Sequence, residues 1–116
     1  MLQIERIQMI DLGIQGENGA REISIDCNAW ASRFEDAEFT LYHRRPGDAA
    51  AEAVTTDWDG ETGILTWTPS EYDTAVAGRG WAEIRLQGTD MTKKTGPIRT
   101  WIRKCVDVSE EEESEP

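Results

Sequence analysis

The segment Thr56–Leu86 constrains the fold of this chain more than any other. It reads TDWDGETGILTWTPSEYDTAVAGRGWAEIRL, in which short alternating runs of apolar and polar residues are separated by turn-forming residues. An apolar residue at every second position is typical of a half-buried strand, whereas an amphipathic helix repeats every 3.6 residues. The pattern predicts strand, tight glycine turn, strand, short corner and one long strand in succession.

The same period of two extends over most of the 116 residues. Short strands with turn signals every 8–12 residues or so are typical of an immunoglobulin-like sandwich, so we predict an all-β, antiparallel sandwich of about seven strands. We expect one domain at residues 1–108, followed by a disordered acidic tail at residues 109–116, which has no apolar residue to bury. The predicted strands are Leu2–Ile10, Arg21–Cys27, Ala37–Arg44, Val54–Trp58, Ile64–Trp67, Gly80–Gln87 and Pro97–Val108.

The formal charge of −11 limits the classes of partner. Five glutamates lie in the last eight residues, SEEEESEP, and without them 12 basic residues still face 18 acidic ones, a charge of −6. Nucleic-acid binding depends on basic patches that displace counterions, and anionic membrane surfaces also attract basic segments. The charge therefore argues against nucleic acid and against a membrane surface as the partner.

The apolar content of the chain suggests where it is made. No apolar run approaches the roughly 20 residues that a membrane span needs. The N-terminus, MLQIERIQMIDLG, carries Glu5 and Arg6 where a signal peptide would be uninterrupted and apolar. We therefore expect synthesis in the cytoplasm without secretion by the general route. Strand parity puts Cys27 on an inward face and Cys105 on an outward one, so we expect two unpaired thiols.

The sequence predicts no catalytic residues, no metal site and no cofactor. Asp57–Glu61 has acids at alternate positions, but an EF-hand loop counted from Asp57 would need Gly and Glu where Thr62 and Thr68 stand, which favours a hairpin turn. His43, the sole histidine, ends a strand before a Pro-Gly turn, so we expect it to be exposed and not catalytic. The chain has no phosphate-binding glycine motif and no CxxC.

The tryptophans carry more information. Parity places Trp67 in the core with Leu65 and with the inward residues Ala82, Ile84 and Leu86, while Trp81 and Trp101 face outward. We predict that Trp81 lies opposite Trp101. This register also sets Glu83 opposite Arg99 and Ile84 opposite Ile98. A register shifted by two residues would place Arg85 opposite Arg99, and this pair of like charges would cost stability. The predicted outward stripe is Trp81, Glu83, Arg85, Arg99, Trp101 and Arg103.

Two interpretations of this stripe stay open. Exposed aromatics interleaved with arginine have the composition of a binding hot spot, for which the partner is a protein or a stacking glycan. The alternative is a cross-strand tryptophan pair that merely stabilises a long hairpin, with arginines stacked on the rings.

A resemblance to a known family rests on a set of turns and strands in the body of the chain. Arg44-Arg45-Pro46-Gly47-Asp48, Gly63-Ile64-Leu65-Thr66-Trp67 and Gly78–Arg85, preceded by Asp73-Thr74, resemble small tailed-phage and prophage proteins. They are similar in style to the N-terminal immunoglobulin-like domain of phage baseplate upper and tail-fibre proteins. The resemblance spans about Arg21 to Val108 and contains no reactive signature.

This resemblance implies a non-enzymatic virion or tail-associated structural or assembly protein. Its partners would be other virion proteins or further copies of itself, and its location the virion, assembled in the cytoplasm of a bacterial host. The alternative function is a carbohydrate-binding or host-adhesion module that uses the same aromatic face. Asp73-Thr74-Ala75-Val76 also resembles the turn before strand F of antibody domains, but Ala77-Gly78-Arg79 replaces the tyrosine and cysteine expected there.

Overall fold

The computed structural model describes residues 1–107, so the predicted acidic tail at 109–116 lies outside the described residues. The described part contains ten strands and one short helix. These are β1 (Leu2–Gln3), β2 (Met9–Ile14), β3 (Ile23–Asp26), α1 (Asn28–Ala31), β4 (Glu38–Arg44), β5 (Glu52–Ala53), β6 (Asp57–Asp59), β7 (Ile64–Trp67), β8 (Gly78–Gln87), β9 (Thr92–Lys94) and β10 (Ile98–Arg103).

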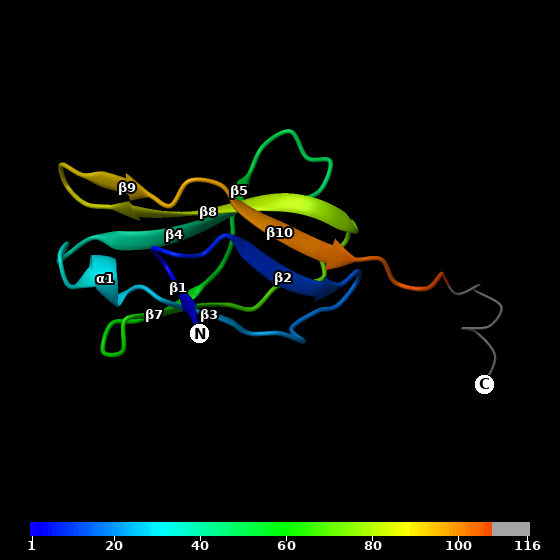
Figure 1. Ribbon diagram of the computed structural model, residues 1–116, viewed down its shortest axis with the longest axis horizontal. Helices are drawn as coiled ribbons and strands as arrows, with labels where there is room; N and C mark the ends of the chain where they lie inside the picture. The colour runs from blue at the N-terminus through cyan, green and yellow to red at the C-terminus, as the bar shows by residue number, and fades with distance from the viewer. Residues whose placement is uncertain (108–116) are drawn as a thin grey trace.

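The strands form two sheets packed face to face (Figure 1). One sheet has the order β1-β3-β7-β6, and the other has the order β2-β10-β8-β4-β5 with β9 also paired to β8. In the lettering of immunoglobulin domains, β1-β3-β7-β6 corresponds to strands A-B-E-D, and β10-β8-β4 in the second sheet corresponds to G-F-C. This is the arrangement of an immunoglobulin sandwich. The predicted immunoglobulin-like β-sandwich is thus confirmed.

The first predicted strand, Leu2–Ile10, is wrong as a single element. The chain pairs with β3 at β1, turns at residues 4–8, where the Ile7 N–H bonds to the Gln3 carbonyl at 3.0 Å, and then joins the other sheet as β2. β1 and β3 are parallel, and so are β2 and β10, so the sheets are mixed and not purely antiparallel as predicted. The apolar residues give the reason, because Ile4 and Ile7 break the period of two.

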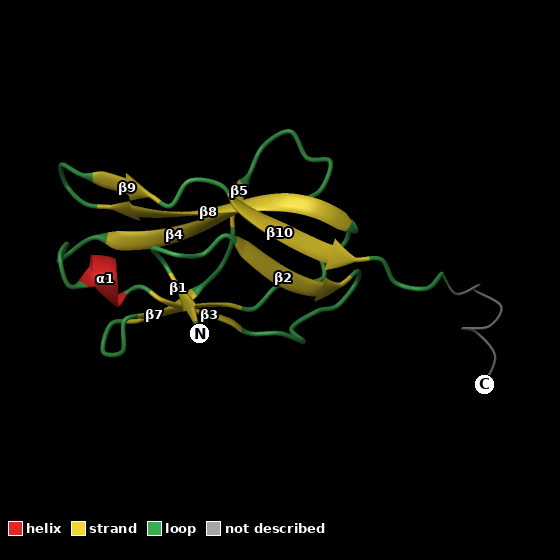
Figure 2. Ribbon diagram, viewed as in Figure 1, coloured by secondary structure: helices red, strands yellow, loops and turns green. Residues whose placement is uncertain are grey.

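The core lies between the two sheets and contains the inward residues that parity predicts. Leu65, Trp67, Ile84 and Leu86 are fully buried, and Ala82 is nearly so. One end of the sandwich is closed by α1, the only helix of the described residues (Figure 2), whose Trp30 is buried. No helix within residues 1–107 is long and apolar enough to cross a membrane. The two cysteines are unpaired as predicted, Cys27 buried and Cys105 exposed.

Strand β8 forms a long interrupted hairpin with β9 and β10. The predicted loop Gly88–Gly96 contains β9, which pairs with the second half of β8, and β10 pairs with the first half and ends at Arg103, before the predicted Val108. This hairpin carries all six of the outward-facing residues that the sequence predicts as a candidate site.

Candidate functional site

The outward side of the six-stranded sheet carries the candidate site. Along β8 the buried positions Gly80, Ala82, Ile84 and Leu86 alternate with more exposed ones, and β10 alternates in the same way. Ten of the outward positions of β2, β4, β8 and β10, grouped around the first part of β8, form what we call the aromatic–arginine face. It comprises Met9, Asp11, Tyr42, Arg44, Arg79, Trp81, Glu83, Arg85, Arg99 and Trp101.

The cross-strand register differs from the predicted one by two residues. Trp101 lies opposite Arg79 and not Trp81, while Trp81 lies opposite Arg99. Ile98 likewise lies opposite Ala82 and not Ile84. The same side chains still face outward, because a shift of two residues preserves strand parity.

A bulge between β9 and β10 offsets their two registers against β8 by one residue. Arg85 and Ala82 are three positions apart on β8, but their partners, Lys94 and Ile98, are four positions apart. The extra residue lies near Thr95, which donates its N–H to the Ile84 carbonyl at 3.0 Å and accepts the Ile84 N–H on its hydroxyl at 3.1 Å. A bulge of this kind re-aims side chains, and strand periodicity alone does not reveal it.

The observed register alternates aromatic and cationic side chains. The Arg79 guanidinium lies 5.9 Å from the centroid of the Trp101 ring, within the range of a cation–π contact. Met9, Arg79, Arg99 and Trp101 line a shallow depression of about 270 Å³ around this contact. Trp81, with 37% of its surface exposed, lines a second, broader depression on the same face.

The charges of the face are only partly compensated. Arg85 bonds to the Glu83 carboxylate at 2.6 Å and lies over the Tyr42 ring at 4.7 Å. Arg44, Arg79 and Arg99 have no carboxylate within 4.0 Å among residues 1–107. These three guanidiniums are exposed to solvent.

Arg103 has the same outward parity on β10 as Arg99 and Trp101, but it lies at the last position of the strand. A register irregularity separates Trp101 from Arg103 where β10 pairs with β2. The Glu17 carboxylate accepts the Ile14 N–H, which lowers the pKa of Glu17, and the positive charges of Arg21 and Arg103 lower it further. Arg103 therefore belongs to the end of the β2–β10 pair, whereas the other five predicted residues share one surface.

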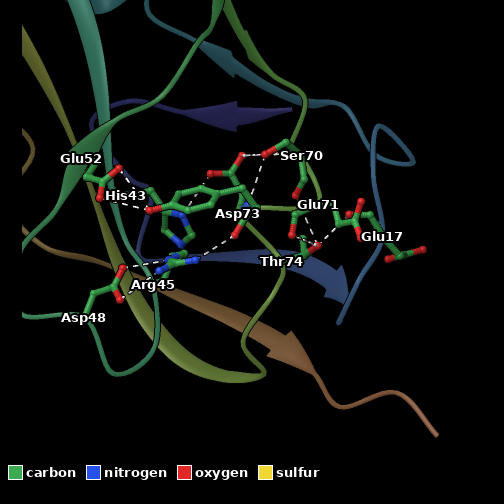
Figure 3. A network of polar contacts seen from close by, with 10 residues as sticks. Glu17, His43, Arg45, Asp48, Glu52, Ser70, Glu71, Asp73 and Thr74 are labelled. Carbon is green, nitrogen blue, oxygen red and sulfur yellow. Dashed lines mark hydrogen bonds and ion pairs between the residues drawn. The ribbon is translucent and has the colours of Figure 1, made fainter. Parts of the chain in front are cut away.

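The prediction that His43 is exposed is wrong. It lies on β4 with only 3% of its surface exposed, on the same inward side as Leu41, and its ring meets the Trp67 ring edge-on at 5.1 Å. Neither ring nitrogen has a hydrogen-bond partner among residues 1–107, and Nδ1 lies 3.6 Å from Asp73 Oδ1 (Figure 3). Parity with Leu41 was the signal that could have placed His43 inside.

Asp73 connects this histidine to the corner that precedes β8. Its Oδ2 accepts hydrogen bonds from the Ser70 N–H at 2.9 Å and from the Ser70 hydroxyl at 3.0 Å. Burial opposes the charged form of Asp73, but the His43 side chain and the two Ser70 donors outweigh that cost and lower the pKa of Asp73.

A second set of polar contacts lies at the surface next to His43 and Asp73 (Figure 3). Arg45 forms a two-point ion pair with Asp48, at 2.8 and 3.2 Å, and lies 4.0 Å over the Tyr72 ring. The Tyr72 hydroxyl bonds in turn to the Glu52 carboxylate at 3.1 Å. These residues, with His43 and Asp73, line a cleft of about 250 Å³.

The arrangement of Ser70, Asp73 and His43 is not that of an acyl-transfer site. In a catalytic triad the histidine lies between the hydroxyl and the carboxylate, so that it can take the nucleophile's proton. Here the carboxylate lies in the middle and the serine donates to it. The geometry is that of a polar contact between the end of β4 and the corner before β8.

The acidic segment Asp57–Glu61 consists of β6 and the first two residues of the hairpin turn that joins β6 to β7. Asp59 Oδ1 accepts the N–H groups of Glu61 and Thr62 at 2.9 and 3.3 Å, which lower the pKa of Asp59. Among the described residues, no group of three or more histidine, cysteine, aspartate or glutamate side chains could hold a metal ion.

Comparisons with known proteins add little to this geometry. No protein-family model matches the sequence, and a search of curated proteins found no match. Among solved structures, the chain is similar to the N-terminal eight Ig domains of Down Syndrome Cell Adhesion Molecule isoform 1.30.30, with 12% sequence identity and a TM-score of 0.43. The similarity covers 87% of this chain and 13% of that chain.

Proposed function

We propose that this protein is a non-enzymatic binding module that contacts another protein through its aromatic–arginine face. The observation that carries the proposal is the pattern of Trp81 and Trp101 alternating with Arg79 and Arg99 on the outward side of one sheet. Tryptophan and arginine are enriched at binding hot spots because each combines a large apolar area with directed polar groups. The two depressions beside the tryptophans give a partner side chain a place to insert.

The biological setting that we propose is a tailed-phage virion. The protein would be a structural or assembly component of the tail or baseplate, made in the bacterial cytoplasm and bound to other virion proteins or to further copies of itself. Support for this setting comes from the resemblance of the Arg44–Asp48 turn and of the later strands to phage baseplate and tail-fibre domains.

The test compares three tryptophan variants. Trp81→Ala and Trp101→Ala remove aromatic area from the face, while Trp58→Ala is a matched control, because Trp58 is 42% exposed but belongs to the other sheet. We expect the first two variants to lose association with a virion partner or with further copies, as measured by sedimentation, and the control to retain it. Unchanged association in Trp81→Ala and Trp101→Ala, together with a lower unfolding midpoint, would leave only the hairpin-stabilising role.

A carbohydrate-binding or host-adhesion module is the second candidate. The observation in its favour is the depression where Trp81 lies beside Tyr42 and Arg85, since sugar rings stack on exposed aromatic side chains. Glycan binding by the isolated monomer, measured by titration calorimetry and lost in Trp81→Ala, would favour this function over protein contacts.

A further inference from the structure

The aromatic–arginine face is positive on a strongly negative chain. It carries four arginines, and its two carboxylates, Glu83 and Asp11, are both already engaged. Glu83 bonds to Arg85, and Asp11 Oδ1 accepts the Gly13 N–H at 2.9 Å. Arg44, Arg79 and Arg99 are thus left to attract an anionic group from outside the described residues.

The chemistry of the depression around Trp101 defines that group further. Two guanidiniums, from Arg79 and Arg99, flank one aromatic ring and one methionine, Met9. Guanidinium forms its strongest directed bonds with carboxylate or phosphate, often with two parallel hydrogen bonds. The flanking apolar surface suits the methylene groups of a glutamate better than it suits a bare phosphate.

The overall charge favours an acidic peptide over a nucleic acid. A long polyanion would extend beyond the arginines over a chain with a formal charge of −11, whereas a short acidic segment contacts the arginines locally, and salt screens the charges that lie farther away. Such a segment is part of this sequence itself, because Glu110–Glu113 and Glu115 lie within eight residues of the C-terminus.

The course of the chain after β10 determines which copy this segment can reach. Residues 104–107 are exposed and lead away from the sandwich beyond the end of β10 (Figure 1). To return to its own face, the chain would have to reverse direction, whereas the face of a neighbouring molecule lies open to it. We propose that the acidic C-terminal segment of one copy docks on the aromatic–arginine face of a second copy.

This inference rests on the proposed function, because it identifies the partner of the same face. When two copies exchange their termini reciprocally, the contact closes a two-fold dimer, and when each terminus reaches a further molecule, it adds copies head to tail. Glutamate side chains of the segment would form charge-assisted bonds to Arg79 and Arg99, and the contact would weaken as salt rises.

The test uses a fluorescent peptide of residues 107–116 and the full chain with its five tail glutamates changed to glutamine, so that the tail does not compete. Anisotropy titration should show saturable binding that weakens about tenfold between about 50 mM and about 300 mM NaCl. Arg79→Gln with Arg99→Gln should weaken binding by about tenfold or more, since both charged partners are lost. Arg6→Gln, an exposed arginine away from the face, is the matched control and should bind as the parent does.

Three results would overturn the inference. These are equal binding of a peptide with glutamine in place of glutamate, equal binding by the Arg79/Arg99 variant, and tighter binding of a single-stranded oligonucleotide of matched length. The unmodified chain, sedimented above the measured peptide dissociation constant, must also form dimers or longer species, and a monomer there is equally contrary. If the peptide fails while Trp81→Ala and Trp101→Ala still abolish association, the tail inference falls and the proposed function stands.

Discussion

His43 and Asp73 meet inside the sandwich, with Nδ1 and Oδ1 3.6 Å apart and both residues more than nine-tenths buried. They come from β4 and from the corner before β8, which are distant in sequence. The His43 ring packs against Trp67, and the Asp73 carboxylate accepts a hydrogen bond from the Ser70 hydroxyl. Antibody domains stabilise this corner with a tyrosine that is absent from this chain. The buried acid and histidine, with Ser70, hold the same corner here through polar contacts.

The Asp73 contact makes the free energy of unfolding depend on pH. The pKa of Asp73 is lowered on folding, so its contribution is complete above the unfolded pKa, about 4, and is lost as the pH falls through the folded value. We expect Asp73→Asn to lower the urea midpoint most at about pH 5 and above, and the difference from the parent to shrink toward about pH 2. Asp90→Asn, at an exposed position, serves as the control, and a constant difference across this range would contradict the prediction.

Gly80 permits the close approach of β4, β8 and β10. A Cβ at this position would lie 2.5 Å from the Arg44 carbonyl oxygen and 2.8 Å from Thr100 Oγ1, and the first of these is backbone that cannot move aside cheaply. We expect Gly80→Ala to lower the free energy of unfolding by about 1–3 kcal/mol, the usual cost of overpacking. Gly60→Ala, whose Cβ would have its nearest neighbour at 3.7 Å, should change stability by less than about 0.5 kcal/mol. Equal effects of the two variants in chemical denaturation would refute the steric argument.

The register of β8 and β10 can be tested by cross-linking. Directly opposite residues have Cα atoms about 4.5–5.5 Å apart, within the reach of a disulfide, while diagonal neighbours lie farther apart. In a Cys105→Ser background, cysteines at Trp81 and Arg99 should therefore oxidise readily to a disulfide that closes the hairpin. Cysteines at Trp81 and Trp101, opposite each other in the register predicted from sequence, should oxidise poorly, as measured by the loss of free thiols. The reverse preference would show that the two strands pair as the sequence suggested.

The sequence was sufficient for the fold class and for which side chains face the core. The burial of Leu65, Trp67 and Ile84 could be predicted because side chains alternate between the two faces of a strand, and the alternating residues of the sequence display this directly. The same parity could have shown that His43 is internal, but its position before a Pro-Gly turn led to the opposite expectation.

Two features could not be predicted from strand parity: the register of β8 with β10, and the passage of the first predicted strand from one sheet to the other. The bulge at Thr95 depends on bonds to Ile84, eleven residues away, and it offsets the pairing of β10 with β8 by one residue from that of β9 with β8. The transfer of the first strand from one sheet to the other depends on the parallel pairing of β2 with β10, which is near the far end of the sequence. The composition of the candidate face was thus predictable, whereas the pairs within it required the three-dimensional structure.

The two thiols should differ sharply in reactivity. Cys27 is fully buried, and this burial raises the pKa of its thiol to about 12, whereas Cys105 is exposed near the end of the described chain. At about pH 8 the reactive thiolate of Cys27 would be only about one part in 10⁴ of the total. We expect Ellman's reagent to modify one thiol rapidly in the native protein and the second only as fast as the protein unfolds. Cys105→Ser should abolish the rapid phase and Cys27→Ser should leave it intact, whereas rapid reaction of both thiols in the native parent would show that Cys27 is accessible.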